Sequence, residues 1–156
     1  MAIPKKITSY LKKNKINYKT LKHEIAYTAQ EIAAVQHIPG DQVAKTVLVK
    51  TEKNFLLAVL PATYLVDFTK LKRLAKAKKI SLAREEDMCK LFPDIEPGAM
   101  PPLGPLFGLP VFVDKTLSEK SEIVFNAGTH MELLKIRYKD FEKINKPVVG
   151  SFGKHV

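Results

Sequence analysis

A ten-residue stretch, 96–105, constrains the fold of this chain more than any other segment. Four of its residues are proline and two are glycine, in the order Glu96-Pro97-Gly98-Ala99-Met100-Pro101-Pro102-Leu103-Gly104-Pro105. Proline lacks a backbone N–H and fixes φ, so neither a helix interior nor a central strand tolerates this density. The stretch therefore predicts a stiff loop. It is either a surface connector or a rigid loop that aims backbone N–H groups at a ligand.

Length and composition indicate a single domain spanning residues 1–156. The chain has 156 residues, of which 46% are hydrophobic, as expected for a globular protein with a real core. Its only cysteine, Cys89, excludes an internal disulfide and fits a reducing cytosol, so we expect a cytoplasmic protein. We find neither a secretion signal nor the roughly 20 consecutive apolar residues of a membrane span, and expect no membrane partner.

The charge is high and unevenly distributed. Lys and Arg number 26 against 16 Asp and Glu, giving a net charge of +10. The whole excess lies in residues 1–90, because residues 91–156 are balanced. Such an excess favours a polyanionic partner, most simply nucleic acid, although lysine-rich solubility is the alternative.

The hydrophobic pattern alternates between helices and strands. Helices are predicted over 4–13, over 28–37 behind the capping box Thr28-Ala29-Gln30-Glu31, over 68–78 behind Asp67, over 84–92, and from 138 or 139 through 144. Strands are predicted over 18–23, 42–51, 55–61, 80–83, 110–114, 122–126, 132–137 and 148–149, with loose residues after them. The segment 55–60 is apolar throughout, so it indicates a strand buried on both faces. Together these predict an α/β domain with a mixed sheet.

The sequence lacks the residue patterns that several classes of enzyme require. Neither a phosphate-binding glycine loop nor a nucleophilic serine in a sharp strand-to-helix turn is present. The four histidines (His23, His37, His130, His155) are scattered without metal-ligand spacing, so no metal or other cofactor is expected. Cys89 lies beside Met88 in a predicted helix and is expected to pack rather than react.

Lys45 is the first residue that suggests a site. It lies within the apolar strand Val43-Ala44-Lys45-Thr46-Val47-Leu48-Val49-Lys50, and alternation puts it on one face with Val47 and Val49. It either extends its amine to the rim of the sheet or lines a pocket as a cation for phosphate or carboxylate.

A second candidate is the turn Gly128-Thr129-His130 between two predicted strands. Glycine can supply a positive φ there, and His130 either merely follows it or projects into a cleft as a hydrogen-bonding or proton-carrying group.

The proline stretch is the third candidate. Its free N–H groups belong to Gly98, Ala99, Met100, Leu103 and Gly104. Prolines lower the entropy cost of holding such a loop, and glycine permits close approach, which suits preorganised donors to an oxyanion.

These three pieces in this order resemble the YbaK family, also called the prolyl-tRNA synthetase-associated editing domain. The matching segments are Gln42-Val43-Ala44-Lys45-Thr46, Gly98-x-x-x-Pro102 with Leu103-Gly104, and Ala127-Gly128-Thr129-His130, and the resemblance covers about residues 5–150. It implies a mixed, strongly bent, barrel-like sheet with surrounding helices. It also implies a trans-editing hydrolase that cleaves the ester of mischarged aminoacyl-tRNA, commonly alanine or cysteine on proline tRNA.

The resemblance also implies roles for individual residues. Lys45 would hold the tRNA 3′ end, Gly98 the aminoacyl group through its backbone, and His130 would line the amino-acid pocket. We expect further substrate contacts from the same loop, from the turn and from the Lys45 strand (Ala99, Met100, Pro102, Gly104, Gly128, Thr129, Thr46 and Lys50). Thr46 neighbours Lys45, whereas Lys50 is a basic residue placed on the opposite face near the same strand end.

The loop departs from the family pattern in its adjacent Pro101-Pro102 and in the bulk of Met100, so the pocket shape is expected to differ. Mischarged tRNA, with a synthetase beside it, is the expected partner of a monomer or weak homodimer. The alternative function is a module that binds tRNA or an aminoacyl ligand without turnover. A DNA-binding role is a weaker option, since no helix-turn-helix is visible.

Overall fold

Three sheets form the framework of the computed structural model, which describes residues 3–22 and 39–155. Its elements, in chain order, are α1 (Lys5–Lys13), β1 (Lys19–Lys22), β2 (Ala44–Thr51), β3 (Phe55–Pro61), β4 (Tyr64–Val66), α3 (Phe68–Leu74), β5 (Ile80–Leu82), α4 (Glu85–Leu91), α5 (Gly104–Phe107), β6 (Val111–Asp114), α6 (Lys115–Ser118), β7 (Glu122–Asn126), β8 (Glu132–Arg137), α7 (Tyr138–Asn145), β9 (Val148–Gly150) and β10 (Gly153–His155). The helix predicted over 28–37 lies outside the described residues.

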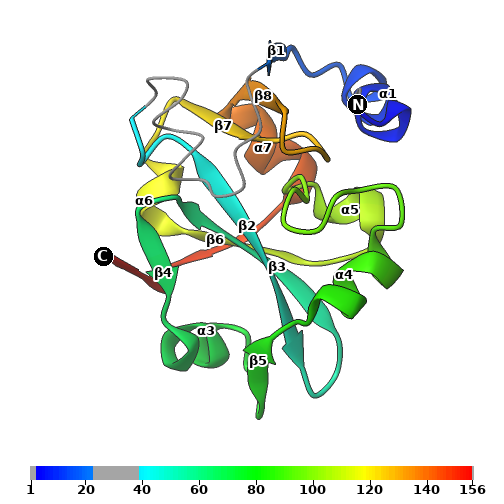
Figure 1. Cartoon of the computed structure of the whole chain (residues 1–156). Helices are drawn as coiled ribbons and strands as arrows, with labels where there is room; N and C mark the ends of the chain where they lie inside the picture. The colour runs from blue at the N-terminus through cyan, green and yellow to red at the C-terminus, as the bar shows by residue number, and fades with distance from the viewer. Residues whose placement is uncertain (1–2, 23–38, 156) are drawn as a thin grey trace.

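The central sheet is mixed, as the sequence predicts. Its order is β5-β2-β3-β6-β9, with antiparallel β5-β2-β3 and parallel β3-β6-β9 pairings. A second sheet, β1-β8-β7, is wholly antiparallel and lies across the top of Figure 1. The parallel bridge Val43↔Val124 joins it to the start of β2. The described strands form open sheets rather than a closed barrel.

Strand β3 is buried on both faces, which confirms the expectation from its apolar run. Leu57 and Val59 face the main core, which α1 and α7 cover, while Leu56 and Leu60 face a second cluster beneath α3. Because hydrophobic burial is the main favourable term in folding, this strand anchors the domain.

The proline stretch contains the start of a helix, which the sequence analysis did not predict. α5 begins at Gly104, and Pro105 occupies its first turn, where a missing N–H leaves no intrahelical bond unmade. A Cβ at Gly104 would lie 2.3 Å from the Leu109 carbonyl oxygen, so only glycine fits this close approach.

Residues 152–155, the last that the structure describes, are held in the fold, contrary to the expected loose end. The buried Asp114 carboxylate accepts the N–H groups of Phe152 at 2.9 Å and Gly153 at 2.6 Å. β10 then pairs with β4, another strand that the sequence pattern did not reveal.

α3 ends at Leu74, four residues before its predicted end. The Glu52 carboxylate accepts the N–H groups of Lys78 and Lys79 at 3.0–3.2 Å, so this backbone is bound to the β2–β3 hairpin instead of continuing the helix. Lys76 adopts a positive φ of 55° at the point of departure.

Candidate functional site

The proline stretch and the β7–β8 turn are hydrogen-bonded into one unit. The Glu96 N–H donates to the Gly128 carbonyl, and the Gly128 N–H donates to the Ala99 carbonyl, both at 3.0 Å. The Glu96 carboxylate accepts the His130 N–H at 3.2 Å. Glu96, which carried no role in the sequence analysis, is therefore the residue that ties the loop to the turn.

The His130 ring fixes one particular peptide group of the loop. Its Nε2 lies 2.9 Å from the Pro97 carbonyl oxygen, and because a carbonyl can only accept, Nε2 carries the hydrogen. That carbonyl belongs to the trans peptide whose N–H is Gly98. In a trans peptide the N–H points away from the C=O, so the buried His130 aims the Gly98 N–H away from itself.

Gly98 is required by its backbone conformation rather than by space. Its φ is +87°, whereas a Cβ added at this position would meet His130 Cε1 at 3.5 Å, an ordinary contact. Any other residue would be strained in this left-handed region.

Hydrogen bonding within the fold leaves two of the five loop donors open. Ala99 donates to the Glu96 carbonyl, Leu103 to the Pro101 carbonyl, and Gly104 to Asn145 Oδ1. Within residues 3–22 and 39–155, the N–H groups of Gly98 and Met100 have no protein acceptor. Two donors of the loop are therefore not used within the described fold: that of Gly98, which is exposed, and that of Met100, which is buried.

The side chains of residues 99–103, in the middle of the loop, face inward. Ala99 and Met100 are buried, with Met100 in the main core, so the bulk of Met100 fills the protein interior rather than a pocket. Asn145 donates from Nδ2 to the Pro102 carbonyl at 2.9 Å while its Oδ1 accepts from Gly104 at 3.0 Å. Pro102 and Gly104 thus brace the loop against α7.

Lys45 lies near the start of β2, at the end of the strand where β7 approaches. The Val124 N–H donates to the Gln42 carbonyl, next to the parallel bridge Val43↔Val124. Lys45 lies two residues after Val43, and Asn126 lies two residues after Val124. Because β2 and β7 run in the same direction here, Lys45 lies on the side of the domain where β7 ends and the turn 127–130 begins.

The amine of Lys45 is partly desolvated. Burial lowers the pKa of Lys45 from its ordinary value, and in the described part of the chain Lys45 forms no ion pair. A half-buried cation without a counter-ion is suited to an anionic ligand.

The two other candidate residues of this strand, Thr46 and Lys50, lie toward opposite ends of β2. Thr46 follows Lys45 and is half-buried. Lys50 lies at the opposite end, exposed, with its amine 5.8 Å from the centre of the Phe55 ring. Five residues of strand separate Lys45 from Lys50 by about 17 Å, so the expectation that they share one strand end was wrong.

Asn126 is a polar residue of this region that sequence reasoning missed. Its Oδ1 is buried and has no hydrogen-bond partner among the described residues. It shares a strand face with Val124, the residue that bridges to Val43. An unpaired buried acceptor costs about 1–3 kcal/mol, so a ligand hydrogen at this position would have a ready partner. The signal in the sequence was only a polar residue closing an apolar strand.

The turn itself is buried. Gly128 has a φ of +93°, and Thr129, whose Oγ1 accepts the Met131 N–H at 3.3 Å, is almost completely buried.

The described residues contain no cluster of three or more His, Cys, Asp or Glu side chains that could hold a metal ion. No described helix combines the length and the apolar character needed to cross a membrane.

Comparison with known proteins gives a family for this geometry. The family model for the aminoacyl-tRNA editing domain matches residues 23–144. The prolyl-tRNA editing protein ProX of Acetoanaerobium sticklandii is 26% identical over 144 residues, which cover 88% of this chain and 87% of that protein.

A proline–tRNA ligase of Staphylococcus saprophyticus is 29% identical over 132 residues, or 81% of this chain, and the match spans about a fifth (21%) of that longer protein. Among solved structures, a candidate trans-editing enzyme for prolyl tRNA synthetase superposes with a TM-score of 0.86 at 21% identity over 99% of both chains. At this identity the structural match establishes the fold alone.

Proposed function

We propose that this chain, which belongs to the aminoacyl-tRNA editing domain family, is a trans-editing hydrolase that cleaves the ester between a wrong amino acid and tRNA. The family match and the relationship to a prolyl-tRNA editing protein support the reaction class. Proline tRNA carrying alanine or cysteine is the proposed substrate, and a synthetase is a proposed partner. We propose that the protein acts in the cytoplasm, as a single domain in a monomer or weak homodimer.

The observation that carries this proposal is the pair of open N–H groups on a braced loop. Ester hydrolysis builds negative charge on the carbonyl oxygen as water attacks the carbonyl carbon. Gly98 and Met100 offer donors that need no reorganisation, because Glu96, His130 and Asn145 already hold the loop. Preorganised donors of this kind contribute about 3–4 kcal/mol each in enzymes that stabilise an oxyanion.

The remaining residues would position the substrate and the loop. Lys45 would hold a phosphate or ribose oxygen of the tRNA 3′ end, since its half-buried amine has no protein counter-ion among the described residues. His130 fixes the Gly98 peptide, and Asn126 Oδ1 would accept a hydrogen from the aminoacyl group or ribose. Water supplies the nucleophile: its oxygen bonds to the acyl carbon, the bond to the ribose oxygen breaks, and a proton passes to that ribose oxygen.

A panel of mischarged tRNAs tests this function directly. Radiolabelled alanine and cysteine esters of proline tRNA, together with correctly charged prolyl-tRNA, are incubated with the protein, and the release of amino acid is measured against the uncatalysed rate. Faster release from at least one mischarged tRNA than from prolyl-tRNA is expected. No acceleration for any ester, from a folded protein, would overturn the proposal.

One observation favours a second candidate, a module that binds without turnover. His130 Nε2 is engaged by the Pro97 carbonyl, so this nitrogen is not placed to move a substrate proton. In that case a salt-dependent complex with charged tRNA would form and the amino acid would stay attached.

A further inference from the structure

All charged residues of the first described segment are cationic. Residues 3–22 contain seven lysines and no acidic residue. We call the six with described, exposed side chains the α1 strip, which comprises Lys5, Lys6, Lys12, Lys13, Lys15 and Lys19. Among the described residues, none of the six takes part in an ion pair, and the ion pairs that occur there involve the cations of Arg84, Lys120, Lys135 and Arg137.

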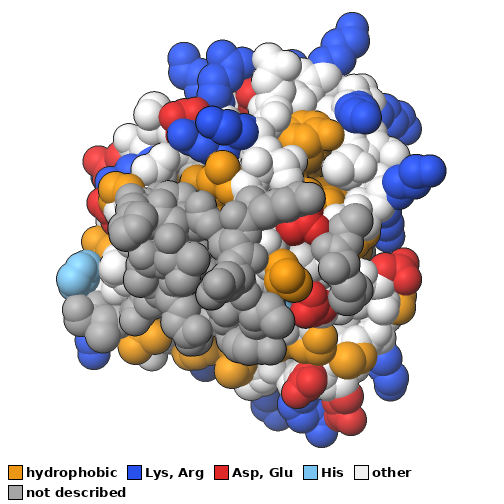
Figure 2. Space-filling view, turned by 45° about the horizontal axis from the view of Figure 1, so that its top comes forward, with side chains coloured by type: hydrophobic (Ala, Val, Ile, Leu, Met, Phe, Trp, Pro, Cys, Tyr) orange, Lys and Arg blue, Asp and Glu red, His pale blue; other side chains and the backbone are white. Residues whose placement is uncertain are grey.

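Helix α1 is anchored by one face, which leaves its lysines to solvent. Ile7 and Leu11 are completely buried in the main core. Lysine and arginine side chains project from the upper and right margins of Figure 2, and α1 lies toward the upper right of Figure 1. The Lys6 amine also lies 4.7 Å from the centre of the Phe107 ring, which belongs to α5.

The position of Lys5 and Lys6 does not stabilise the helix. They occupy its first turn, which contains no acidic residue. The positive end of the helix dipole lies there, so cations are unfavourable in this turn and acids are favourable. α4 shows the usual arrangement, with Glu85, Glu86 and Asp87 in its first turn. The helix dipole therefore does not account for Lys5 and Lys6; Lys6 has the Phe107 ring as a protein partner, and Lys5 is exposed to solvent.

The α1 strip adjoins the candidate site. At Gly128, in the turn that is bonded to the Gly98 loop, an added Cβ would meet Pro4 Cδ at 3.0 Å and Ile7 Cδ1 at 3.2 Å. The start of α1 therefore lies directly against the turn that leads to His130. β1 continues the strip along β8, where Lys19 stands opposite Lys135 in register and Lys135 is itself paired with Glu122 at 3.5 Å.

The spacing of the lysines suits a nucleic-acid backbone. Lys5 and Lys6 precede Lys12 and Lys13 by seven residues, which is about 10 Å along the helix axis. Phosphates of one strand of a DNA duplex repeat at about 3.4 Å along its axis, and the repeat in an RNA duplex is somewhat shorter, so the two pairs span roughly three to four nucleotides.

We propose that the α1 strip binds the phosphates of the tRNA acceptor stem while the 3′ end lies at the Gly98 loop. The inference rests on the proposed function for its choice of RNA. It assigns to α1 the electrostatic part of affinity, which carries little sequence information but fixes the position of the duplex.

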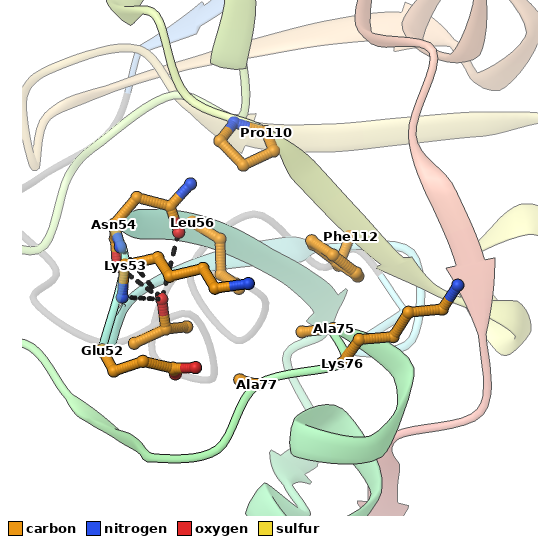
Figure 3. Close-up of a pocket in the computed structure, with 10 residues that line it drawn as sticks. Glu52, Lys53, Asn54, Leu56, Ala75, Lys76, Ala77, Pro110 and Phe112 are labelled. Carbon is orange, nitrogen blue, oxygen red and sulfur yellow. Dashed lines mark hydrogen bonds between the residues drawn. The ribbon is translucent and has the colours of Figure 1, made fainter.

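A second basic region provides a matched control. The hairpin pole comprises the exposed cations around the β2–β3 turn and the end of α3, namely Lys50, Lys53, Lys70, Lys72, Arg73, Lys76, Lys78 and Lys79. A pocket of about 220 Å³ lies at this pole and is lined by Lys53 and Lys76 among others (Figure 3). It lies at the Thr51 end of β2, away from Lys45.

Two double variants with equal charge change test the inference. Lys5→Glu/Lys6→Glu alters the α1 strip, and Lys78→Glu/Lys79→Glu alters the hairpin pole. Binding of uncharged proline tRNA is measured by fluorescence anisotropy from about 50 to 200 mM salt. We expect the first variant to lose about tenfold or more in affinity and to lower the salt slope by about 2, while the second stays near the parent.

Uncharged tRNA requires no hydrolysis, so this result is independent of the proposed activity. A further arm uses the alanyl ester of the trinucleotide CCA, which lacks the acceptor stem. Both variants are expected to hydrolyse this ester at the rate of the parent protein. Lys5→Gln/Lys6→Gln should show an intermediate loss, and far-UV circular dichroism should show an unchanged fold. Equal losses in both double variants, or no binding of tRNA by the parent protein, would overturn the inference.

Discussion

The α1 strip and the hairpin pole both carry many positive charges, but the α1 strip has two lysines, Lys5 and Lys6, that the dipole of their own helix disfavours. At the hairpin pole, Lys72 and Arg73 lie in the last turn of α3, where cations are favourable by about 0.3–1 kcal/mol each. Glu52 binds the backbone of Lys78 and Lys79, and these hydrogen bonds lower the pKa of Glu52. In the α1 strip, Lys12 and Lys13 also lie in the last turn of their helix, whereas Lys5 and Lys6 lie in its first turn and oppose the helix dipole. The two regions therefore differ less in the number of their positive charges than in where those charges lie along a helix.

The two regions also mark the two ends of β2. Lys45 stands near the start of the strand, where it meets β7, and Lys50 stands at the hairpin end. If the site lies at the first end only, changes there should reduce activity while equal changes at the second should not.

The largest effect is expected from Lys45→Ala. Losing a charge-assisted contact to the tRNA 3′ end removes about 1.5–3 kcal/mol, which corresponds to a fall in kcat/KM of about 10–100-fold. Lys50→Ala removes the same side chain from the other end of the strand and should leave kcat/KM near the parent value. Initial rates of amino-acid release measure both, and an equal loss in the two variants would remove the distinction between the ends.

Next in size is Gly128→Ala, which probes the contact between α1 and the turn. A positive φ penalises alanine by about 1 kcal/mol, and displacing Pro4 and Ile7 adds about 1–2 kcal/mol. Gly108→Ala is the control, because Gly108 also has a positive φ (+70°) but has open space around it. Urea denaturation should show a loss for Gly128→Ala at least about 1 kcal/mol greater than for Gly108→Ala; similar losses would mean that α1 moves freely.

A smaller effect, of opposite sign for stability and activity, is expected at Asn126. Asn126→Leu removes a buried acceptor that has no partner within the described chain, so stability should rise by up to about 1 kcal/mol while deacylation falls. Thermal unfolding and initial rates measure the pair. A variant that loses stability in proportion to its activity would show that Asn126 serves the fold instead.

The smallest effect concerns the pH dependence of stability. Burial lowers the pKa of Lys45 below 10.5, so between the lowered pKa and 10.5 the unfolded chain binds more protons and this residue makes stability rise with pH. Lys45→Met abolishes that dependence. Its Tm should therefore exceed that of the parent near pH 7, with the difference shrinking toward pH 10.5, and Lys50→Met controls for loss of an exposed lysine. A constant difference would contradict this assignment.

Pattern alone predicted most of the framework. β3 revealed itself as a doubly buried strand because its apolar run has no polar interruption, and α4 because acids mark its first turn. β10 escaped prediction because its order comes from Asp114, which is 39 residues away in the chain. α5 escaped prediction because Pro105 resembles a helix breaker, although it occupies the first turn of the helix.

The candidate site was predictable only in part. Composition identified the loop and the turn, and alternation drew attention to Lys45, but no pattern shows which N–H groups remain open. That depends on Glu96, Pro101 and Asn145, which supply the acceptors for Ala99, Leu103 and Gly104. Lys50 was misplaced because alternation gives a side chain's face but not its distance along the strand.

The open donors of Gly98 and Met100 belong to the backbone, and this has a consequence for mutational scanning. Replacing Met100 by alanine leaves its N–H in place and changes only a core side chain. A scan of side chains would therefore score the loop by its packing and pass over its chemistry. Replacement of a single amide by an ester through chemical protein synthesis would remove one donor and keep every side chain, making these two positions visible.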